Sequence, residues 1–554
     1  MEAIAESGVL KATANGEGKT RRDRHLQTAR RLDWRYLLPD PSLREVAYVG
    51  RPEGTLLEAL EQFSEAVTVV GPGSEKSGEF GVAVLRSRKR GEVELASSVL
   101  QAGGHLYWEV EGGRRGPSAR RCVAWLKQLG YDQIELNWNR PSFENCLEII
   151  PLGEPSAATF VLSRRYGGVR RRMVQLVGRL LAKLGMLRWL MPCQSIVARK
   201  RAPAEQSMNA VETFVRRNWE RLELGEDGPP NRLTSIVATP AFRASRHAVF
   251  MIFAKGSPEP RLVAKTPRLT DETSSLDREV ANLRALHAVR PGGFDSAPRV
   301  LAYEAQWGSQ LLLETAVAGH TMRPAVVRRR PKECGEAGIR WLVEVQQASA
   351  QRRHDPRGAI ERLVNGPLNY FERVFPVTKE EKELIAETRR LVKPLESMEI
   401  PLVFEHGDFS APNILMGEDG EIGVVDWELA EPQGLPAVDL FFFISYLAFA
   451  RSRAEKVEEY LDAFRGAFFG PEAWAPQYVA RYQARLRLPA ASLKPLFIAC
   501  WSRYVAKFLA RLNDLGAGPR AKPEEETAEW LRSNRYFSLW SYAVKHGDQL
   551  RLAE

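Results

Sequence analysis

Residues 402–428 constrain the fold of this chain more than any other segment. An apolar run at 402–404 opens the segment, and a second run at 422–425 lies near its end. Between the two runs, Asp419-Gly420 is a strong hairpin signal, because this dipeptide adopts the backbone conformation of a tight turn. The pattern therefore predicts short strands on both sides of a turn.

Three polar side chains stand at the ends of these expected strands. Asp408 follows the first apolar run, Asn413 comes five residues later, and Asp426 directly follows the last run. Folding the hairpin should bring Asp426 beside Asn413. Phosphoryl transfer needs such a set, in which one carboxylate orients and deprotonates a hydroxyl while hard oxygen ligands hold Mg²⁺. We expect Asp408 to be the base, with Asn413 and Asp426 as metal ligands. The alternative is a surface hairpin with incidental acids.

The wider motif resembles the aminoglycoside phosphotransferase and choline kinase family, which has a protein-kinase-like fold. The matching parts are His406-Gly407-Asp408 with Asn413, then residues 425–428 and 434–440. The resemblance implies the same roles for the two aspartates and the asparagine, and a loop-supporting role for Asp439. A second His-Gly-Asp at 546–548 has no asparagine five residues later, and we interpret it as tail structure.

Upstream segments are similar to the nucleotide-binding part of the same family. Lys265 ends an apolar strand, and the resemblance implies that it grips the nucleotide phosphates while Glu279, in the following helix, pairs with it. The strand and hinge that contain Glu314 and Ala316 are expected to hold adenine through backbone groups. The phosphate-facing turn, which includes Ser245, has no glycine, whereas protein kinases carry a glycine-rich turn there. This is the largest departure from the family pattern.

The N-terminal part alternates short apolar runs with helix-like segments, which predicts a βαβ arrangement with a mostly parallel sheet. The order resembles a class I S-adenosylmethionine (SAM) methyltransferase domain of Rossmann-like α/β fold. The acidic residue that normally ends the second strand of that family appears as Val70 or Gly71. Adenosine then lacks a polar anchor, so SAM binding is not expected and the domain is interpreted as degenerate. A divergent, working methyltransferase is the alternative.

The predicted fold is therefore an α/β domain followed by an α+β protein-kinase-like domain with a largely helical C-lobe. The expected boundaries are a flexible arm at 1–30, a methyltransferase-like domain at 31–202, a kinase-like N-lobe at 203–320, and a C-lobe at 321–554 with the catalytic loop at 404–428.

A basic insertion at 164–191 interrupts the N-terminal domain. Residues 164–201 contain eleven Arg and Lys, and no acidic residue lies between Glu154 and Glu205. Apolar residues recur there at steps of three and four, which predicts an amphipathic helix. One interpretation is a helix that binds an anionic membrane surface or a phosphorylated glycan. The other is an insertion packed on its own domain with a solvated basic face.

Composition narrows the classes of partner and compartment. The net charge of +10 favours acidic partners such as nucleotides, phosphorylated substrates or anionic membranes, and no nucleic-acid motif accompanies it. Five scattered cysteines predict free thiols in a reducing compartment. Without a signal core or an apolar run of about 18 residues, a cytoplasmic protein is expected, with possible peripheral attachment to the inner membrane face.

These observations together predict an ATP- and Mg²⁺-dependent phosphotransferase that acts on a hydroxyl of a small molecule, a sugar or a lipid-linked glycan. Two alternatives remain open. One is an inactive scaffold that joins a pseudokinase to a pseudo-methyltransferase, and the other is a bifunctional kinase and methyltransferase.

Overall fold

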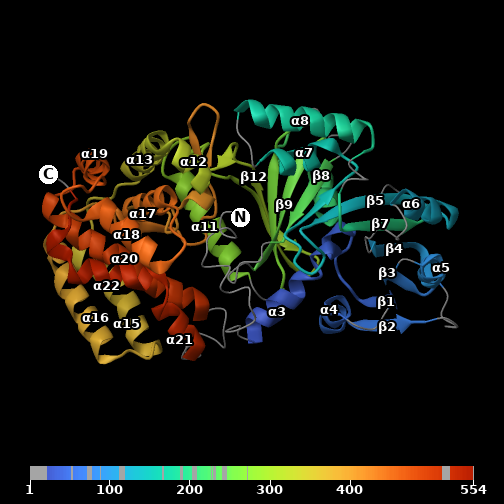
Figure 1. Cartoon of the computed structure of the whole chain (residues 1–554), viewed down its shortest axis with the longest axis horizontal. Helices are drawn as coiled ribbons and strands as arrows, with labels where there is room; N and C mark the ends of the chain where they lie inside the picture. The colour runs from blue at the N-terminus through green and yellow to red at the C-terminus, as the bar shows by residue number, and fades with distance from the viewer. Residues whose placement is uncertain are drawn as a thin grey trace. The chain divides into compact units, whose positions relative to one another are not determined.

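A computed structural model describes most of the chain and divides it into two compact units (Figure 1). The first unit comprises residues 1–23, 274–299 and 317–554, and the second comprises 24–273 and 300–316. The described residues are 21–50, 54–71, 78–87, 89–110, 119–164, 168–186, 191–202, 209–225, 228, 233–239, 246–270, 273–513 and 525–552.

One mixed sheet of twelve described strands forms the frame of the second unit. Its order is β11-β12-β10-β9-β8-β6-β5-β7-β4-β3-β1-β2. The strands are β1 (Glu45–Gly50), β2 (Ala66–Val70), β3 (Phe80–Arg86), β4 (Leu100–Val110), β5 (Tyr131–Arg140), β6 (Glu148–Pro151), β7 (Gln194–Lys200), β8 (Leu233–Ala238), β9 (His247–Ala254), β10 (Leu262–Pro267), β11 (Val300–Gln306) and β12 (Ser309–Thr315).

The N-terminal part of this sheet is half parallel and half antiparallel. Strands β2, β1, β3 and β4 pair in parallel, whereas β7 runs antiparallel between β4 and β5, and β6 is antiparallel to β5. The mostly parallel sheet expected from the sequence is therefore only partly observed. Alternate residues of β1 face opposite sides, since Val46 and Tyr48 join one core cluster while Ala47 and Val49 join the other.

Helices cover both faces of this N-terminal region. Helix α4 (Thr55–Phe63) contributes Leu57 and Leu60 to one core cluster. Helices α5 (Arg90–Val99), α6 (Ala119–Gln128) and α7 (Pro155–Ser163) contribute buried residues to the other. The arm expected at 1–30 is a helix, α3, over Arg21–Arg30, and residues 1–20 lie outside the described residues.

Strands β6 and β8 join the N-terminal region to the kinase-like strands within one sheet. They pair antiparallel, with Glu148 opposite Ala238 and Ile149 opposite Val237. Strands β8, β9, β10, β12 and β11 then form an antiparallel series. The boundary expected at 202–203 lies inside this unit, and residues 203–208 are outside the described ones. The sequence analysis did not predict that β6 pairs with β8, because no local pattern specifies which strands become neighbours.

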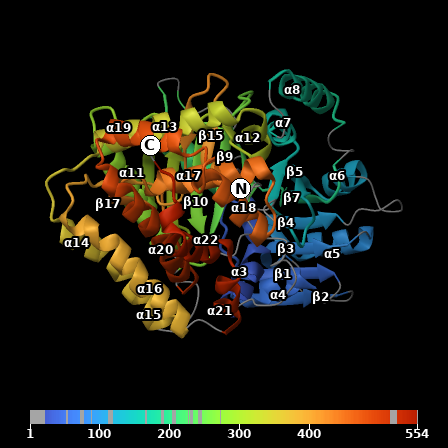
Figure 2. The same cartoon turned by 60° about the vertical axis from the view of Figure 1, so that its left-hand side comes forward.

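The first unit is largely helical (Figures 1 and 2). Its longer described helices are α11 (Ser274–Ala288), α13 (Pro331–Ala348), α16 (Lys379–Val392), α17 (Val438–Ser452), α18 (Val457–Phe468), α19 (Pro476–Leu486), α20 (Ala490–Asn513) and α22 (Arg535–Lys545). Asn534 accepts a hydrogen bond from the Tyr536 amide and begins α22, so α21 (Glu525–Arg532) is a separate helix.

Two further findings concern covalent state and membrane topology. All five cysteines carry free thiols, as expected from their spacing. Across the described ranges, no helix combines the length and apolar character that a bilayer crossing requires.

Candidate active site

The predicted hairpin is present in the first unit. Strands β15 (Ile414–Met416) and β16 (Ile422–Val424) pair antiparallel, with Ile414 opposite Val424. The pairing continues one step further, because the amide of Val425 donates to the carbonyl of Asn413 at 3.0 Å. Asp426 is the next residue, so the chain positions Asn413 and Asp426 on adjacent strand ends as the sequence indicates.

Asn413 also fixes the position of Asp408. Its Nδ2 donates to the Oδ2 and to the carbonyl oxygen of Asp408, both at 3.1 Å. The Ser410 hydroxyl donates to the other carboxylate oxygen, Oδ1, at 3.3 Å. Asn413 is 5 % exposed whereas Asp408 is half-buried. The carboxylate of Asp408 is therefore held in one orientation while part of it remains open to solvent.

The side chain of Asp426 lies at the other end of this arrangement. Its backbone φ is +72°, a left-handed conformation that non-glycine residues adopt infrequently and that is common at functional sites. No donor among the described residues reaches its carboxylate. Both side-chain hydrogen bonds of Asn413 use Nδ2, and no described donor reaches its Oδ1. Asn413 and Asp426, on adjacent strand ends, thus each offer a hard oxygen group, which fits the donor chemistry of Mg²⁺.

Asp439 supports the turn that precedes Asp408. It lies in the first turn of α17, is buried, and accepts hydrogen bonds from the amides of His406 at 2.7 Å and Gly407 at 2.9 Å. Burial raises the pKa of Asp439 to about 7, and the nearby Glu405 carboxylate adds to this increase. Gly407 has a φ of +80°, and a Cβ there would overlap the carbonyl of Leu429, so the turn requires glycine.

His406 connects the two strand ends rather than facing a substrate. Its Nε2 lies 3.1 Å from the carbonyl of Val425, and its Nδ1 accepts the amide of Asp408 at 3.3 Å. The ring also packs edge-on against Trp427, with centroids 4.6 Å apart. Burial lowers the pKa of His406 to about 4, which keeps the imidazole neutral and able to act as donor and acceptor at once.

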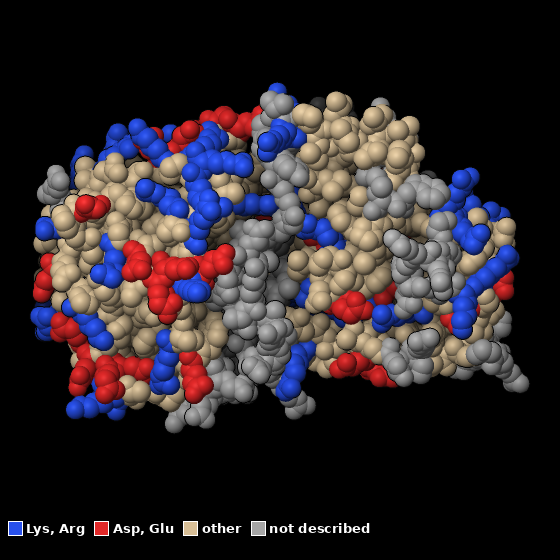
Figure 3. Space-filling view, in the orientation of Figure 1, with Lys and Arg blue, Asp and Glu red and all other residues tan. Residues whose placement is uncertain are grey.

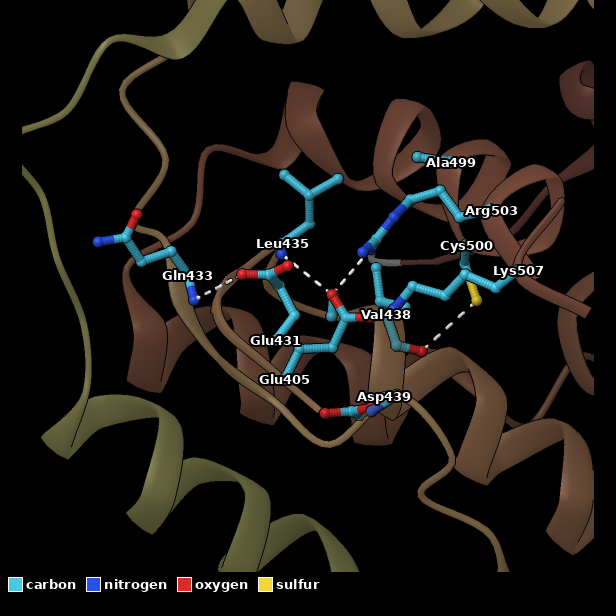
Figure 4. A network of polar contacts seen from close by, with 12 residues as sticks. Glu405, Glu431, Gln433, Leu435, Val438, Asp439, Ala499, Cys500, Arg503 and Lys507 are labelled. Carbon is cyan, nitrogen blue, oxygen red and sulfur yellow. Dashed lines mark hydrogen bonds and ion pairs between the residues drawn. The ribbon is translucent and has the colours of Figure 1, made fainter. Parts of the chain in front are cut away.

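A buried ion cluster lies directly behind the turn (Figure 4). Glu405, 1 % exposed, pairs with Arg503 at 2.8 Å and with Lys507 at 3.2 Å, both from α20, and accepts the amide of Leu435. Burial alone would raise the pKa of Glu405, but the two cations outweigh it and lower the pKa to about 2. Sequence reasoning missed this cluster, since the partners lie about a hundred residues away on a helix with no motif of its own.

Helix α11 holds the segment that follows Asp426. Glu279 is buried, and its Oε1 accepts the amide of Trp427 at 3.3 Å. Asn282 donates to the carbonyls of Trp427 at 2.8 Å and Ala430 at 3.2 Å. Glu279 thus contacts the catalytic loop itself, a contact that the sequence did not indicate.

Two of the expected nucleotide-binding residues of the second unit, Lys265 and Glu314, pair with each other. Lys265 forms an ion pair with Glu314 at 3.1 Å across β10 and β12. The amide of Ala316 donates to the carbonyl of Arg261 at 2.9 Å. Lys265 and Glu279 belong to different units, and their pairing stays a prediction. Ser245 and its turn lie outside the described residues.

The polar groups of this loop are thus carried on a hairpin. Residues 244–477 match the model of the phosphotransferase enzyme family, so the resemblance indicated by the motif is confirmed. No curated protein sequence matches the chain.

Solved structures similar to the chain include three kinases. A choline/ethanolamine kinase family protein from Mesorhizobium loti is 16 % identical, with a TM-score of 0.32, and the match covers 60 % of this chain and 98 % of that one. An ethanolamine kinase from Plasmodium vivax is 11 % identical, with a TM-score of 0.38, and the match covers 59 % of this chain and 88 % of that one. A choline kinase from Streptococcus pneumoniae is 10 % identical, with a TM-score of 0.36, and the match covers 60 % of this chain and 98 % of that one. Similarities this distant do not indicate which substrate this chain uses.

Proposed function

We propose that the protein transfers the γ-phosphoryl group of ATP, with Mg²⁺, to a hydroxyl of a small molecule, a sugar or a lipid-linked glycan. The observation that carries this proposal is the Asp408–Asn413 pair, in which a half-buried carboxylate is oriented by an amide whose own oxygen stays available. The family match over residues 244–477 supports phosphotransferase chemistry of this kind.

Asp408 is the proposed catalytic base. Its carboxylate orients the acceptor hydroxyl and takes its proton as the hydroxyl oxygen bonds to the γ-phosphorus. The bond from that phosphorus to the bridging oxygen breaks, and ADP leaves with the electron pair. Asn413 and Asp426 would hold Mg²⁺, which when bound neutralises charge on the phosphates. Positioning and electrostatic stabilisation then supply most of the rate.

The nucleotide is proposed to contact the second unit through the residues expected from the family resemblance. Lys265 would meet the phosphates, with Glu279 as its partner and Ser245 nearby, and the segment of Glu314 and Ala316 would meet adenine. Lys265 forms an ion pair with Glu314, which helps to orient its side chain.

We further propose that the N-terminal region is a degenerate methyltransferase-like domain that does not bind SAM. Strands β2, β1, β3 and β4 pair in parallel, which supports the topological likeness. Strand β2 ends in Val70, an apolar residue that is 3 % exposed and cannot hold ribose hydroxyls. Calorimetry of the full chain with SAM tests this directly, and saturable binding would favour the bifunctional alternative.

An acceptor screen with Mg·ATP tests the kinase proposal. The full chain is incubated with choline-like bases, aminoglycosides, sugars and lipid-linked glycans, and ADP release and phosphorylated product are measured, with Asp408→Asn as the blank. Product formation that the blank lacks supports the assignment. Failure of the chain to bind Mg·ATP by calorimetry would instead support the inactive scaffold.

A further inference from the structure

Helix α8 (Gly168–Lys183) and the turn after it expose most of the large apolar side chains on the described surface. Among the described residues, seven large apolar side chains are prominently exposed, and six belong to this segment. The exposed fraction reaches 70 % for Leu176 and 63 % for Leu184, so most of the surface of these two residues is in water. The six are Met173, Leu176, Val177, Leu180, Leu184 and Met186.

The layering of the second unit explains why this face is uncovered. Helix α7 packs on the sheet through Ala157, Ala158 and Val161, which belong to the core. Helix α8 lies on the outside of α7 (Figures 1 and 2). Their contact uses a small residue, since a Cβ on Gly178 would overlap the methyl group of Thr159. Leu181 of α8 also packs against this core, whereas the six exposed apolar side chains do not, so the exposed face itself does not pack on its own domain.

Arginines border the exposed apolar face on both sides. At about 100° per residue, Met173, Leu176, Val177, Leu180 and Leu184 fall within an arc of about 100° on the helix. On the same projection, the exposed side chains of Arg172 and Arg179 follow one edge of the arc, and that of Arg170 follows the other. In Figure 3 the surface over α8 is mainly uncharged, without acidic residues among it. The sequence agrees, because residues 155–204 contain no Asp or Glu.

We propose that α8 binds the surface of an anionic lipid bilayer. The apolar arc would enter the boundary between head groups and acyl chains, and the bordering arginines would contact lipid phosphates and carboxylates at both edges. A second copy of the chain is a poor occupant of this face, because it would bring the same basic side chains together with no acidic residue of either segment to pair with them. The proposal does not depend on phosphotransferase activity.

Vesicle sedimentation of the full chain, without nucleotide, tests the proposal. The chain is mixed with phosphatidylcholine vesicles and with vesicles that also contain phosphatidylserine. Leu176→Ser combined with Leu180→Ser removes apolar contact, and Arg170→Gln combined with Arg179→Gln removes charge. We expect binding mainly to the phosphatidylserine vesicles, a loss of about tenfold or more for the leucine pair, and a loss of about tenfold for the arginine pair.

Matched controls separate a specific effect from general surface chemistry. Val69→Ser changes the exposed apolar residue on β2, and Arg216→Gln combined with Arg217→Gln removes two exposed arginines from α10 (Ala210–Arg217). Both controls should bind as the parent chain does. Equal binding to the two vesicle types, or unchanged binding of the leucine pair, would overturn the proposal. If the parent chain binds no vesicles but forms a dimer, and the Leu176→Ser, Leu180→Ser variant is a monomer, the face would be assigned to self-association instead.

Discussion

Acidic residues at two places in the molecule differ in how fully their carboxylate oxygens are paired. One place is the proposed catalytic loop of the first unit, and the other is the carboxyl end of β4 in the second unit. In the loop, Asp426 receives no hydrogen bond from the described residues, and Asp408 stays half-exposed. At the end of β4, Glu109 is 0 % exposed and its two oxygens are taken by Arg31 at 2.7 and 2.8 Å and by the Tyr107 hydroxyl at 3.1 Å.

This difference distinguishes a reactive site from a structural ion cluster. A group that must meet a substrate or metal needs free lone pairs, whereas a buried charge without partners costs several kcal/mol. The carboxyl ends of parallel strands are where ligands usually bind in α/β sheets. Here Arg31 and Trp34 cover that position, with the Trp34 ring stacked 4.0 Å from Tyr107. The comparison teaches that chemistry is expected at the loop of the first unit, and packing at the carboxyl end of β4.

The largest effect should come from removing the proposed base. Asp408→Asn keeps the shape of the side chain and its contact with Asn413 but cannot accept a proton. We expect the rate of phosphoryl transfer to fall by about 10²–10⁴-fold, with the unfolding midpoint in urea unchanged. Rates are measured as ADP release with a saturating acceptor. An active Asp408→Asn enzyme would show that the open carboxylate is not the base.

The reverse pattern is expected for the cluster at β4. Arg31→Met leaves the buried Glu109 without its cation, and the free energy of unfolding should fall by about 3–5 kcal/mol. Urea unfolding at neutral pH measures this loss, and activity per folded molecule should not change. Adding Glu109→Gln to Arg31→Met should restore most of the stability, because the uncompensated charge is then gone. A double variant as unstable as the single one would contradict this explanation.

Much of the site could be predicted from the sequence because its residues are close together in the chain. A tight turn between two short strands forces Asn413 and Asp426 into proximity, whatever the rest of the fold does. The same holds for most strands and helices, whose apolar periodicity is local. The pairing of Glu405 with Arg503, the joining of β6 to β8, and the contact of Glu279 with the Trp427 amide all depend on tertiary packing. No local pattern encodes such partners.

Glu212 differs from both Asp426 and Glu109, because it is a buried acid that stays protonated. Asn209 and Ser235 donate to its Oε1 at 2.8 and 2.9 Å, and burial raises the pKa of Glu212 from 4.5 to about 8. Between these values the folded chain holds a proton that the unfolded chain has released. The free energy of unfolding therefore falls as pH rises from 4.5 to 8 and changes no further above that.

Glu212→Gln should remove this pH dependence. The amide is neutral at every pH, so the variant should gain about 2–4 kcal/mol relative to the parent between about pH 5 and about pH 9. Urea unfolding across that range measures the difference. A parent chain whose difference from the variant stays constant with pH would show that Glu212 is ionised in the folded state.

The smallest expected effect sharpens the description of the loop. Ser410 donates to Asp408 Oδ1 at 3.3 Å, a long contact to the oxygen that Asn413 does not hold. Ser410→Ala should lower the rate only a few-fold, by about 0.5–1.5 kcal/mol, because Asn413 still fixes the carboxylate.

Asn413→Ala removes that fixation and a proposed metal ligand, so it should also raise the Mg²⁺ concentration needed for half-maximal rate. If Ser410→Ala shifted the Mg²⁺ requirement as strongly, the two side chains would share one orienting role, and the metal-ligand assignment of Asn413 would lose its support.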